Sequence, residues 1–355
     1  MAKSKRDNIH YSFRKVDGYK KPNVFVISAR EAGKSTAVWL DKSYKKFKDK
    51  GQTTLVIRRN IVSITNAYID SIFKIIRKFN PDDELEVHYQ RGALKEGIVD
   101  VKVNGVTYLL IVALSVSIDR IKSLVLENIG VIIFDEFIVN KAFGEKYLSK
   151  EIDRFKEVYN TFYRESEETL VTYFLGNPYS LYNPYFLHYG VDITKLKPGI
   201  ILSGDTWVVE CYELTQELKD YILSRNPLYQ FDDSYTRYAF NGEAVNDMNV
   251  RLLTTPPPQF GLQFVVRMEG KLIGFFFNKN VKSEKDDYFH CRFMDSTKRE
   301  VICFDFGELV DGAVLWNTRS DRWIFEMFKI AMRTRRVTFG DINVYNLCEQ
   351  IYYQL

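Results

Sequence analysis

The chain has 355 residues, of which 46% are hydrophobic and 15% are aromatic. This length is comfortable for two domains, and the composition excludes an extended disordered chain. No apolar run approaches the ~20 residues that a membrane-spanning helix needs. The first residues, Met1-Ala-Lys-Ser-Lys-Arg6, lack the apolar core of a signal peptide, so the sequence predicts a cytosolic protein without a membrane partner.

The net charge is only +4 and says little about partners, but the cations are unevenly distributed. Residues 1–22 hold seven Lys or Arg against two Asp, and residues 319–336 hold six Lys or Arg against one Asp and one Glu. Two basic segments at opposite ends suit a polyanion, although an ordinary solvated surface explains either one equally well. The four cysteines form no C-x-x-C pair and do not cluster with the four histidines, so neither zinc nor disulfides are expected.

An apolar run that breaks into a loop of small residues, Val24-Phe-Val-Ile-Ser-Ala-Arg-Glu-Ala-Gly-Lys-Ser-Thr36, has the pattern of strand, loop and helix. In a P-loop, backbone N–H groups wrap the phosphates of ATP, a Lys contacts the β and γ oxygens, and a hydroxyl holds Mg²⁺. Lys34 and Ser35 fill those roles within Gly33-Lys34-Ser35-Thr36. Ser28 stands where the motif begins with Gly, so we predict a variant P-loop; the alternative is a chance Gly-Lys-Ser loop.

Further along the chain, four apolar residues run into two carboxylates in Gly130-Val-Ile-Ile-Phe-Asp-Glu-Phe137. This is the form of a buried parallel strand that ends in a Walker B pair. Asp135 would hold the shell of the Mg²⁺ ion, and Glu136 would polarise the water that attacks the γ-phosphate. The alternative is a solvated strand end, but two motifs in the right order make that alternative weak.

Strands alternate with helices through this part of the chain. The apolar patterns predict a helix over residues 35–50, a strand over 53–58, a helix with a core-facing stripe over 61–79 and a strand over 106–114. Residues 84–104 alternate around a turn at Arg91-Gly-Ala93, which indicates an antiparallel hairpin. The expected fold class is α/β, with a mainly parallel sheet and helices on both faces.

Between the two Walker strands lies one more strand, 106–114. An added strand, with a Glu after the Walker B Asp, is typical of the additional-strand, catalytic-glutamate (ASCE) branch of P-loop NTPases. After a helix predicted at 151–166, a strand at 169–177 ends at Asn177. A carboxamide at that place can sense the γ-phosphate and contact the Walker B carboxylate. Asn177 is the sensor candidate, and a plain Gly-Asn-Pro turn is the alternative.

Three motifs together carry a resemblance to a known family: Ser-x-Arg-x-x-Gly-Lys-Ser from Ser28, the Walker B segment Phe-Asp-Glu-Phe, and a strand ending in Asn-Pro. With a small C-terminal domain after them, they resemble the viral DNA-packaging ATPases, most closely the phi-twenty-nine-like motors of small podoviruses, which are cousins of the large terminases. The resemblance is strongest over residues 22–178. It implies an ATP-hydrolysing, Mg²⁺-dependent motor that moves double-stranded viral DNA into a procapsid. It also implies a location in the cytoplasm of the infected host cell and, transiently, on the procapsid vertex.

The resemblance further implies a homo-oligomeric ring, commonly a pentamer, with ATP at the subunit interfaces and a catalytic cation supplied by a neighbour. Lys122, before the Walker B strand, and Arg164, at the end of the helix before the sensor strand, match the family's placement of that cation. Arg154 is an alternative to Arg164, and Arg30 resembles the in-loop arginine of other terminases. Each is equally well explained as an ordinary surface cation. The implied partners are the portal or connector of the procapsid and, as an open alternative, a packaging RNA.

The predicted domains are a P-loop motor domain at 1–213, a linker or hinge at 214–258 and a C-terminal α+β domain at 259–355. Short strands are expected at 263–268, 272–277, 288–293 and 301–306, and a helix at 321–332. In large terminases this region is an RNase H-like nuclease, which needs several carboxylates around two metal ions. The first strand carries Arg267 and no Asp, which leaves only Asp305 and Asp311.

We therefore expect a nuclease-like fold without cutting activity. Candidates for contacts with phosphates or the capsid are Arg335, Arg336, Lys279 and Lys282. The competing hypotheses are a large terminase with a working metal-dependent nuclease, another ring-forming nucleic-acid translocase, and a capsid or nucleic-acid binding protein with a degenerate P-loop.

Overall fold

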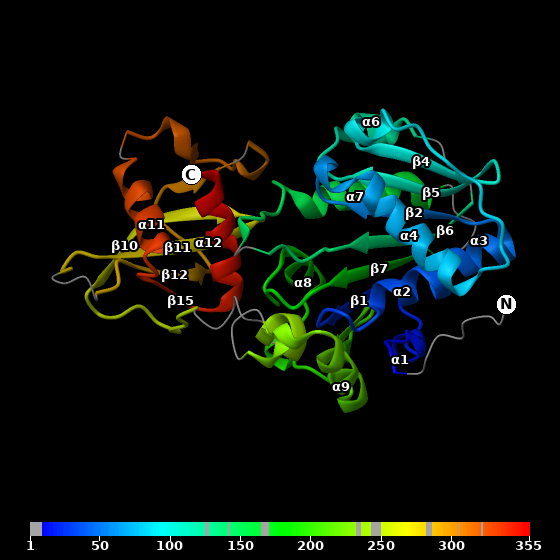
Figure 1. Cartoon of the computed structure of the whole chain (residues 1–355). Coiled ribbons are helices and arrows are strands. Elements are labelled where there is room, and N and C mark those ends of the chain that lie inside the picture. Colours follow the sequence, from blue (N-terminus) through cyan, green and yellow to red (C-terminus); the bar gives the residue numbers. More distant parts are fainter. Residues whose placement is uncertain are drawn as a thin grey trace. The chain divides into compact units, whose positions relative to one another are not determined.

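The structure is a computed structural model that describes residues 9–124, 128–140, 143–164, 170–231, 236–242, 250–281, 286–304, 306–320 and 322–355. Two compact units make up the chain, Met1–Asn246 and Asp247–Leu355. In Figure 1 the first unit runs from blue to yellow-green and the second from yellow to red. The expected linker at 214–258 is divided between them, because the residues up to 246 belong to the first unit.

A large sheet forms the centre of the first unit, in the order β3-β4-β5-β2-β6-β7-β1-β9-β8. The strands are β1 (Asn23–Ser28), β2 (Thr53–Arg58), β3 (Val87–His88), β4 (Ile98–Val103), β5 (Val106–Ala113), β6 (Ile129–Asp135), β7 (Val171–Gly176), β8 (Ile201–Ser203) and β9 (Trp207–Tyr212). The run from β5 to β9 is parallel throughout, whereas β3, β4 and β8 pair antiparallel at the edges. The predicted α/β class with a mainly parallel sheet is confirmed.

The strand that lies between the two Walker strands in space differs from the sequence expectation. It is β7, which pairs with β1 on one side and β6 on the other. The strand at 106–113 instead pairs with β2 and β4. Order along the chain does not give order in a parallel sheet, because each crossover connection can skip over a neighbouring strand. The prediction that 106–114 is the added strand was therefore wrong.

Helices cover both faces of this sheet. Phe134 of β6 packs against Phe155 and Tyr185 on one face. Ile57 of β2 pairs with Phe134 and therefore faces the same side of the sheet. Because side chains alternate along a strand, Thr54, three residues before Ile57, points to the opposite face. There the Thr54 hydroxyl lies 2.8 Å from the Ser43 hydroxyl, in the helix that follows β1. The central strands are therefore buried on both sides, which explains their continuous apolar sequences.

The helices of the first unit are α1 (Arg14–Asp17), α2 (Lys34–Ala37), α3 (Lys45–Lys50), α4 (Asn66–Phe79), α5 (Ala93–Glu96), α6 (Ile118–Lys122), α7 (Glu151–Tyr163), α8 (Pro184–Tyr189) and α9 (Gln216–Arg225) (Figure 1). A π-helical stretch, Val38–Tyr44, joins α2 to α3, so one helix runs over 34–50 close to the prediction. Helix α4 starts later than predicted because the Thr65 side chain accepts a hydrogen bond from the Tyr68 N–H and caps the first turn.

Two connections join the edge strands β3, β4 and β5. Asn104 and Gly105, with φ of 51° and 82°, form the tight turn between β4 and β5. The predicted hairpin of 84–104 exists as the antiparallel pair β3–β4. Its connection, however, contains the short helix α5 rather than a simple turn at Arg91-Gly-Ala93.

The end of the first unit packs onto the loop after β1. Two short helical turns follow α9, a 3-10 turn at Pro227–Gln230 and a π turn at Arg237–Asn241. The backbone N–H of Arg30 donates to the Ala239 carbonyl at 2.8 Å, and the Tyr229 hydroxyl donates to Glu31 Oε1 at 3.3 Å. Part of the expected linker is thus joined to the predicted P-loop.

The second unit is built on a sheet in the order β14-β13-β10-β11-β12-β15. Its elements are β10 (Phe260–Met268), β11 (Lys271–Asn278), β12 (Phe289–Met294), β13 (Val301–Cys303), β14 (Ala313–Leu315), α11 (Trp323–Arg333), β15 (Val337–Phe339) and α12 (Ile342–Gln354). Strands β10 to β12 are an antiparallel meander, and β13 and β14 continue the sheet in parallel. Helix α11 packs Phe325 and Phe328 on the phenylalanines of β10 and β11.

Candidate active site

The loop between β1 and α2 turns at two residues with positive φ, Glu31 at 60° and Gly33 at 87°. Ser28 is buried at the end of β1 and has no positive φ, which explains how serine can stand at the first position of this loop. A Cβ added to Gly33 would lie 3.0 Å from the Cβ of His10. Gly33 is therefore required both by its backbone conformation and by the close approach of His10.

Lys34 is buried at the start of the helix that follows this loop. Its ammonium group donates to Asn177 Oδ1 at 2.8 Å and lies 3.5 Å from the Ser28 carbonyl oxygen. Burial lowers the pKa of Lys34 to about 8, against the opposing influence of the Asp135 and Glu136 carboxylates. A buried cation thus stands next to N–H groups that have no acceptor within the helix, which is an arrangement suited to an anion.

The two carboxylates at the end of β6 differ in their surroundings. Burial raises the pKa of Asp135, while the nearby cations Arg58 and Lys34 lower it. Glu136 is mostly exposed and has a φ of 61°. Arg58 joins the two, since one of its nitrogens lies 2.8 Å from Glu136 Oε2 and another 3.5 Å from Asp135 Oδ2. In this structure Glu136 is held by an arginine.

A chain of hydrogen bonds links the sensor candidate to the loop. Asn177, directly after β7, accepts from Lys34 and donates to the Tyr179 hydroxyl at 3.3 Å. That hydroxyl also accepts from the Arg30 guanidinium at 2.9 Å. The carboxamide was expected to contact the Walker B carboxylate, but its contact here is with the lysine of the loop. Arg30, Asn177 and Lys34 thus belong to one network.

The structure places the three other cation candidates away from this network. Lys122 is exposed on α6 and pairs with Glu157 at 2.9 Å. Arg154, on α7, donates to the backbone carbonyls of Leu114 and Val116 at 3.2 and 3.5 Å. Arg164 is exposed at the end of α7.

Ser35 and Thr36 follow Lys34 in the first turn of the helix and are half-buried. In the part of the chain that the structure describes, no group of three or more His, Cys, Asp or Glu side chains is placed to hold a metal ion by itself. A cation here would therefore need hydroxyl, water or phosphate oxygens in addition to Asp135.

Sequence reasoning missed Arg58, Arg59 and Tyr179. Arg59 makes a bidentate ion pair with the buried Glu151, at 2.9 Å for both bonds, and donates to the Phe137 carbonyl. The available signal was that an apolar strand ends in one arginine and is followed directly by another. Because carboxyl ends of parallel strands meet at one edge of a sheet, those arginines had to lie near the end of β6. Tyr179 gave no comparable signal.

The second unit carries an ion pair where a nuclease would need a carboxylate. Arg267 Nε on β10 lies 3.4 Å from Glu308 Oε2, and Asp311 is exposed. Asp305 and Lys282 lie outside the described residues. Of the cations proposed to meet phosphates, Lys279 and Arg335 are exposed, and the Arg336 guanidinium stacks 3.5 Å from the centroid of the Tyr288 ring.

The sequence profile of the Podovirus DNA encapsidation protein (Gp16) family matches residues 5–200. The chain belongs to this family. The matched region contains the β1 loop, the carboxylates that end β6, and Asn177, so the whole network described above lies within the family's own boundaries. The comparison of this chain with curated protein sequences found no match.

Solved structures with the same fold extend over both units of this encapsidation protein. One, from the bacteriophage Phi-29 viral genome packaging motor assembly, has a TM-score of 0.64 at 18% identity and covers 98% of this chain and 99% of its own. Another, the Phi-28 gp11 DNA packaging motor, has a TM-score of 0.66 at 13% identity and covers 98% of this chain and 97% of its own. The crystal structure of the N-terminal domain of the phi29 DNA packaging ATPase is 27% identical over 57% of this chain and 96% of its own, with a TM-score of 0.48.

No helix among the described ranges is long and apolar enough to cross a membrane.

Proposed function

We propose that this encapsidation protein is an ATPase that drives double-stranded viral DNA into a procapsid. Membership of the encapsidation family supports the packaging role. The observation that supports ATP hydrolysis is the convergence of the buried Lys34, the Walker B pair and Asn177 at one edge of the sheet. The position of β7 between β1 and β6 supports the ASCE class of P-loop NTPase.

The residues at this edge fit ATP with Mg²⁺. Gly33 and the N–H groups that follow it would wrap the β-phosphate, and Lys34 would exchange its bond to Asn177 for the phosphate oxygens. The Ser35 hydroxyl and the Asp135 carboxylate are the oxygen donors that Mg²⁺ prefers. When bound, Mg²⁺ supplies charge neutralisation of the phosphate oxygens.

Glu136 is the proposed general base. The ion pair with Arg58 at 2.8 Å engages only one of its two oxygens, so Glu136 would accept the proton of a water either through its second oxygen or after it leaves Arg58. Asn177, once Lys34 turns to the nucleotide, is free to donate to the γ-phosphate or to that water. The network through Tyr179 would pass the change to Arg30.

A neighbouring subunit is proposed to complete the site. In a ring, commonly a pentamer, Arg164 is the stronger candidate for the cation in trans, because it is exposed at a helix end. Lys122 is exposed but paired, and Arg154 is bonded within its own subunit. The procapsid portal and, as an alternative adaptor, a packaging RNA are the proposed partners, in the infected cell's cytoplasm and on the procapsid vertex.

The second unit is proposed to be a nuclease-like domain without cutting activity. An antiparallel meander followed by two parallel strands supports an RNase H-like fold. The pair Arg267–Glu308 puts a cation on its first strand, where metal binding would be opposed. Purified protein with plasmid and Mn²⁺ should leave the plasmid intact. Nicking that Asp305→Ala abolishes would favour the alternative of an active terminase nuclease.

Replacing Lys34 tests the ATPase directly. Lys34→Ala should reduce DNA-stimulated ATP hydrolysis by about 10²–10³-fold, because the phosphates lose a buried cation. The control Lys74→Ala, at an exposed position on α4, should hydrolyse ATP like the natural chain. Turnover of Lys34→Ala at the control's rate would favour the alternative of a binding protein with a degenerate P-loop.

The lowered pKa of Lys34 predicts how nucleotide affinity depends on pH. As the pH rises through about 8, the free protein loses the Lys34 proton and with it the positive charge that the phosphates need. Affinity for a non-hydrolysable ATP analogue should therefore fall above this pH, by up to about tenfold per pH unit. Lys34→Arg keeps its charge in this range and should give a flat profile. A flat profile for the natural chain would contradict the assignment.

A further inference from the structure

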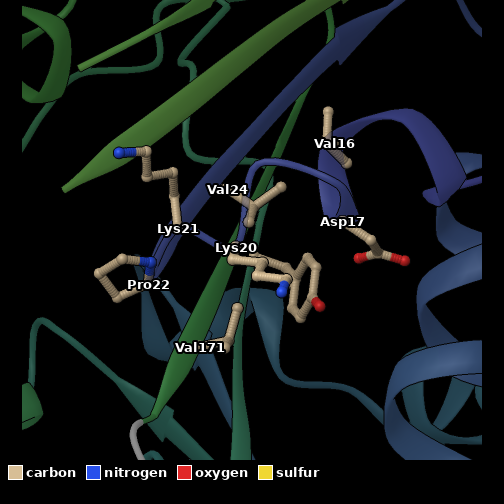
Figure 2. A pocket seen from close by; sticks show the side chains of 8 residues that line it. Val16, Asp17, Lys20, Lys21, Pro22, Val24 and Val171 are labelled. Carbon is tan, nitrogen blue, oxygen red and sulfur yellow. The ribbon is translucent and has the colours of Figure 1, made fainter. Parts of the chain in front are cut away.

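A cavity lies at the start of β1, at the opposite end of this strand from the P-loop. Its volume is about 330 Å³, and it is lined by Val16, Asp17, Lys20, Lys21, Pro22, Val24, Val171 and Tyr173. These residues come from α1, the loop after it, and the beginnings of β1 and β7 (Figure 2). Since β1 rises about 3.3 Å per residue over its length, roughly 20 Å separate this cavity from the phosphate loop. A ligand here cannot be the ATP that Lys34 holds.

Among the described residues, the charge at this cavity is positive. The carboxylate of Asp17 is neutralised by Lys42, at 2.6 and 2.7 Å. Lys21 donates one of its three N–H groups to the Asp205 carbonyl at 3.0 Å. Lys20 is exposed, and its ammonium group makes no hydrogen bond or ion pair in the described part of the chain. Two cationic groups therefore remain for a ligand. Residues 165–168, three of which are Glu, lie outside the described residues.

The backbone at Lys20 is held in an unfavourable conformation. Its φ is 52°, in the left-handed region that costs a residue with a side chain about 1 kcal/mol or more. The conformation is fixed by backbone hydrogen bonds from Tyr19 to Val16 and from Lys20 to Asp17. Figure 2 shows Lys20 in the middle of the lining residues, with Lys21 and Asp17 on either side. Lysine stands here although glycine would relieve the strain.

The walls of the cavity are apolar apart from these groups. Three valines and Pro22 line it, together with Tyr173, whose side chain is almost fully buried. A pocket of this size with an apolar wall and a few charged groups suits a small organic moiety that carries an anion. Arg14 and Lys15 are exposed on the adjacent α1, so cations continue beyond the cavity. The combination matches a phosphodiester with its sugar, followed by further phosphates.

We propose that this cavity binds the backbone of a polynucleotide, with one phosphate at Lys20, a second phosphate at Lys21, whose amine points to the other side of the chain (Figure 2), and the sugar between them against the apolar wall. The proposed function enters this inference only in the choice of a polynucleotide as the ligand of the cavity. Double-stranded DNA and an RNA adaptor share this chemistry. The site is separate from the P-loop and from the cations of the second unit, so it adds a contact on the motor unit itself.

The test is binding of the full chain, without nucleotide, to labelled duplex DNA and to duplex RNA of the same sequence over a series of salt concentrations. The variant is Lys20→Gln with Lys21→Gln. Loss of two phosphate contacts should weaken binding at least about tenfold and reduce the salt slope by about two. The change should appear with DNA, with RNA or with both, and the duplex affected identifies the source of the phosphate.

The matched control is Lys74→Gln with Lys78→Gln, which removes the same charge from exposed positions on α4. If the cavity variant binds both duplexes like this control, the proposal is overturned. ATP hydrolysis without DNA should be unchanged in the cavity variant, which verifies its folding. Because binding is measured without ATP, failure here leaves the ATPase proposal intact. Conversely, if the natural chain does not hydrolyse ATP but its duplex affinity still falls with Lys20→Gln and Lys21→Gln, only the ATPase proposal is contradicted.

Discussion

Glu136→Gln is expected to lower the turnover of ATP by about 10²–10⁴-fold while nucleotide binding persists, because a carboxamide cannot accept the proton of the attacking water. The substitution preserves shape, and the side chain is mostly exposed, so the fold should be retained. Binding would be measured with a fluorescent ATP analogue and turnover by phosphate release. Together the two readouts separate a lost base from a lost nucleotide site.

A surface ion pair supplies the control for Glu136→Gln. Glu96 is as exposed as Glu136 and also meets an arginine, since Arg120 lies 2.9 Å away. Glu96→Gln should therefore reproduce any effect of releasing an arginine from a surface carboxylate, and turnover should stay at the natural rate. A Glu136→Gln variant that hydrolyses ATP as fast as Glu96→Gln would remove Glu136 from the mechanism.

Glu151→Gln is expected to destabilise the first unit by about 3–5 kcal/mol, because it leaves the Arg59 guanidinium buried without its counter-charge. Both side chains are almost fully buried. Glu151 also accepts from the Tyr185 hydroxyl and from the Leu148 N–H, both at 2.8 Å. Arg59 in turn donates to the carbonyls of Glu136 and Phe137. The pair thus fixes the backbone directly after β6.

Urea unfolding gives the free energy for this comparison. Glu157 lies on the same helix as Glu151, and the variant Glu157→Gln breaks its exposed pair with Lys122 of α6, which should cost no more than about 1 kcal/mol. A loss of similar size for Glu151→Gln would mean that the buried pair contributes little. Because Arg59 contacts the Glu136 carbonyl, Glu151→Gln should also reduce the turnover of ATP at urea concentrations too low to unfold the protein.

Much of the first unit could be predicted, since its signals are local. Lys34 and Asp135 are identified by short motifs, and the buried parallel strands by their continuous apolar sequences. The order of the strands could not be obtained in this way, and the added strand was assigned to 106–114 instead of β7. The second unit was harder, because β14 and β15 are only three residues each and too short for a periodic pattern.

The partners of the site residues were less predictable than the residues themselves. The sequence could place Arg58 near the end of β6, but it does not indicate that Arg58 pairs with Glu136 or that Asn177 bonds Lys34. These contacts depend on the register between strands that are distant in the chain. The cavity beside Lys20 is a similar case, because α1, β1 and β7 meet there only in the fold.

Movement of DNA is the most direct test of the proposed motor, because proteins that package nothing can also hydrolyse ATP or bind DNA. Procapsids carrying the portal would be incubated with the encapsidation protein, viral DNA and ATP, and the DNA protected from added nuclease would be measured. The natural chain should protect DNA only with hydrolysable ATP, and Lys34→Ala should protect none. Protection without hydrolysis, or at the natural level with Lys34→Ala, would contradict the proposal that this P-loop drives packaging.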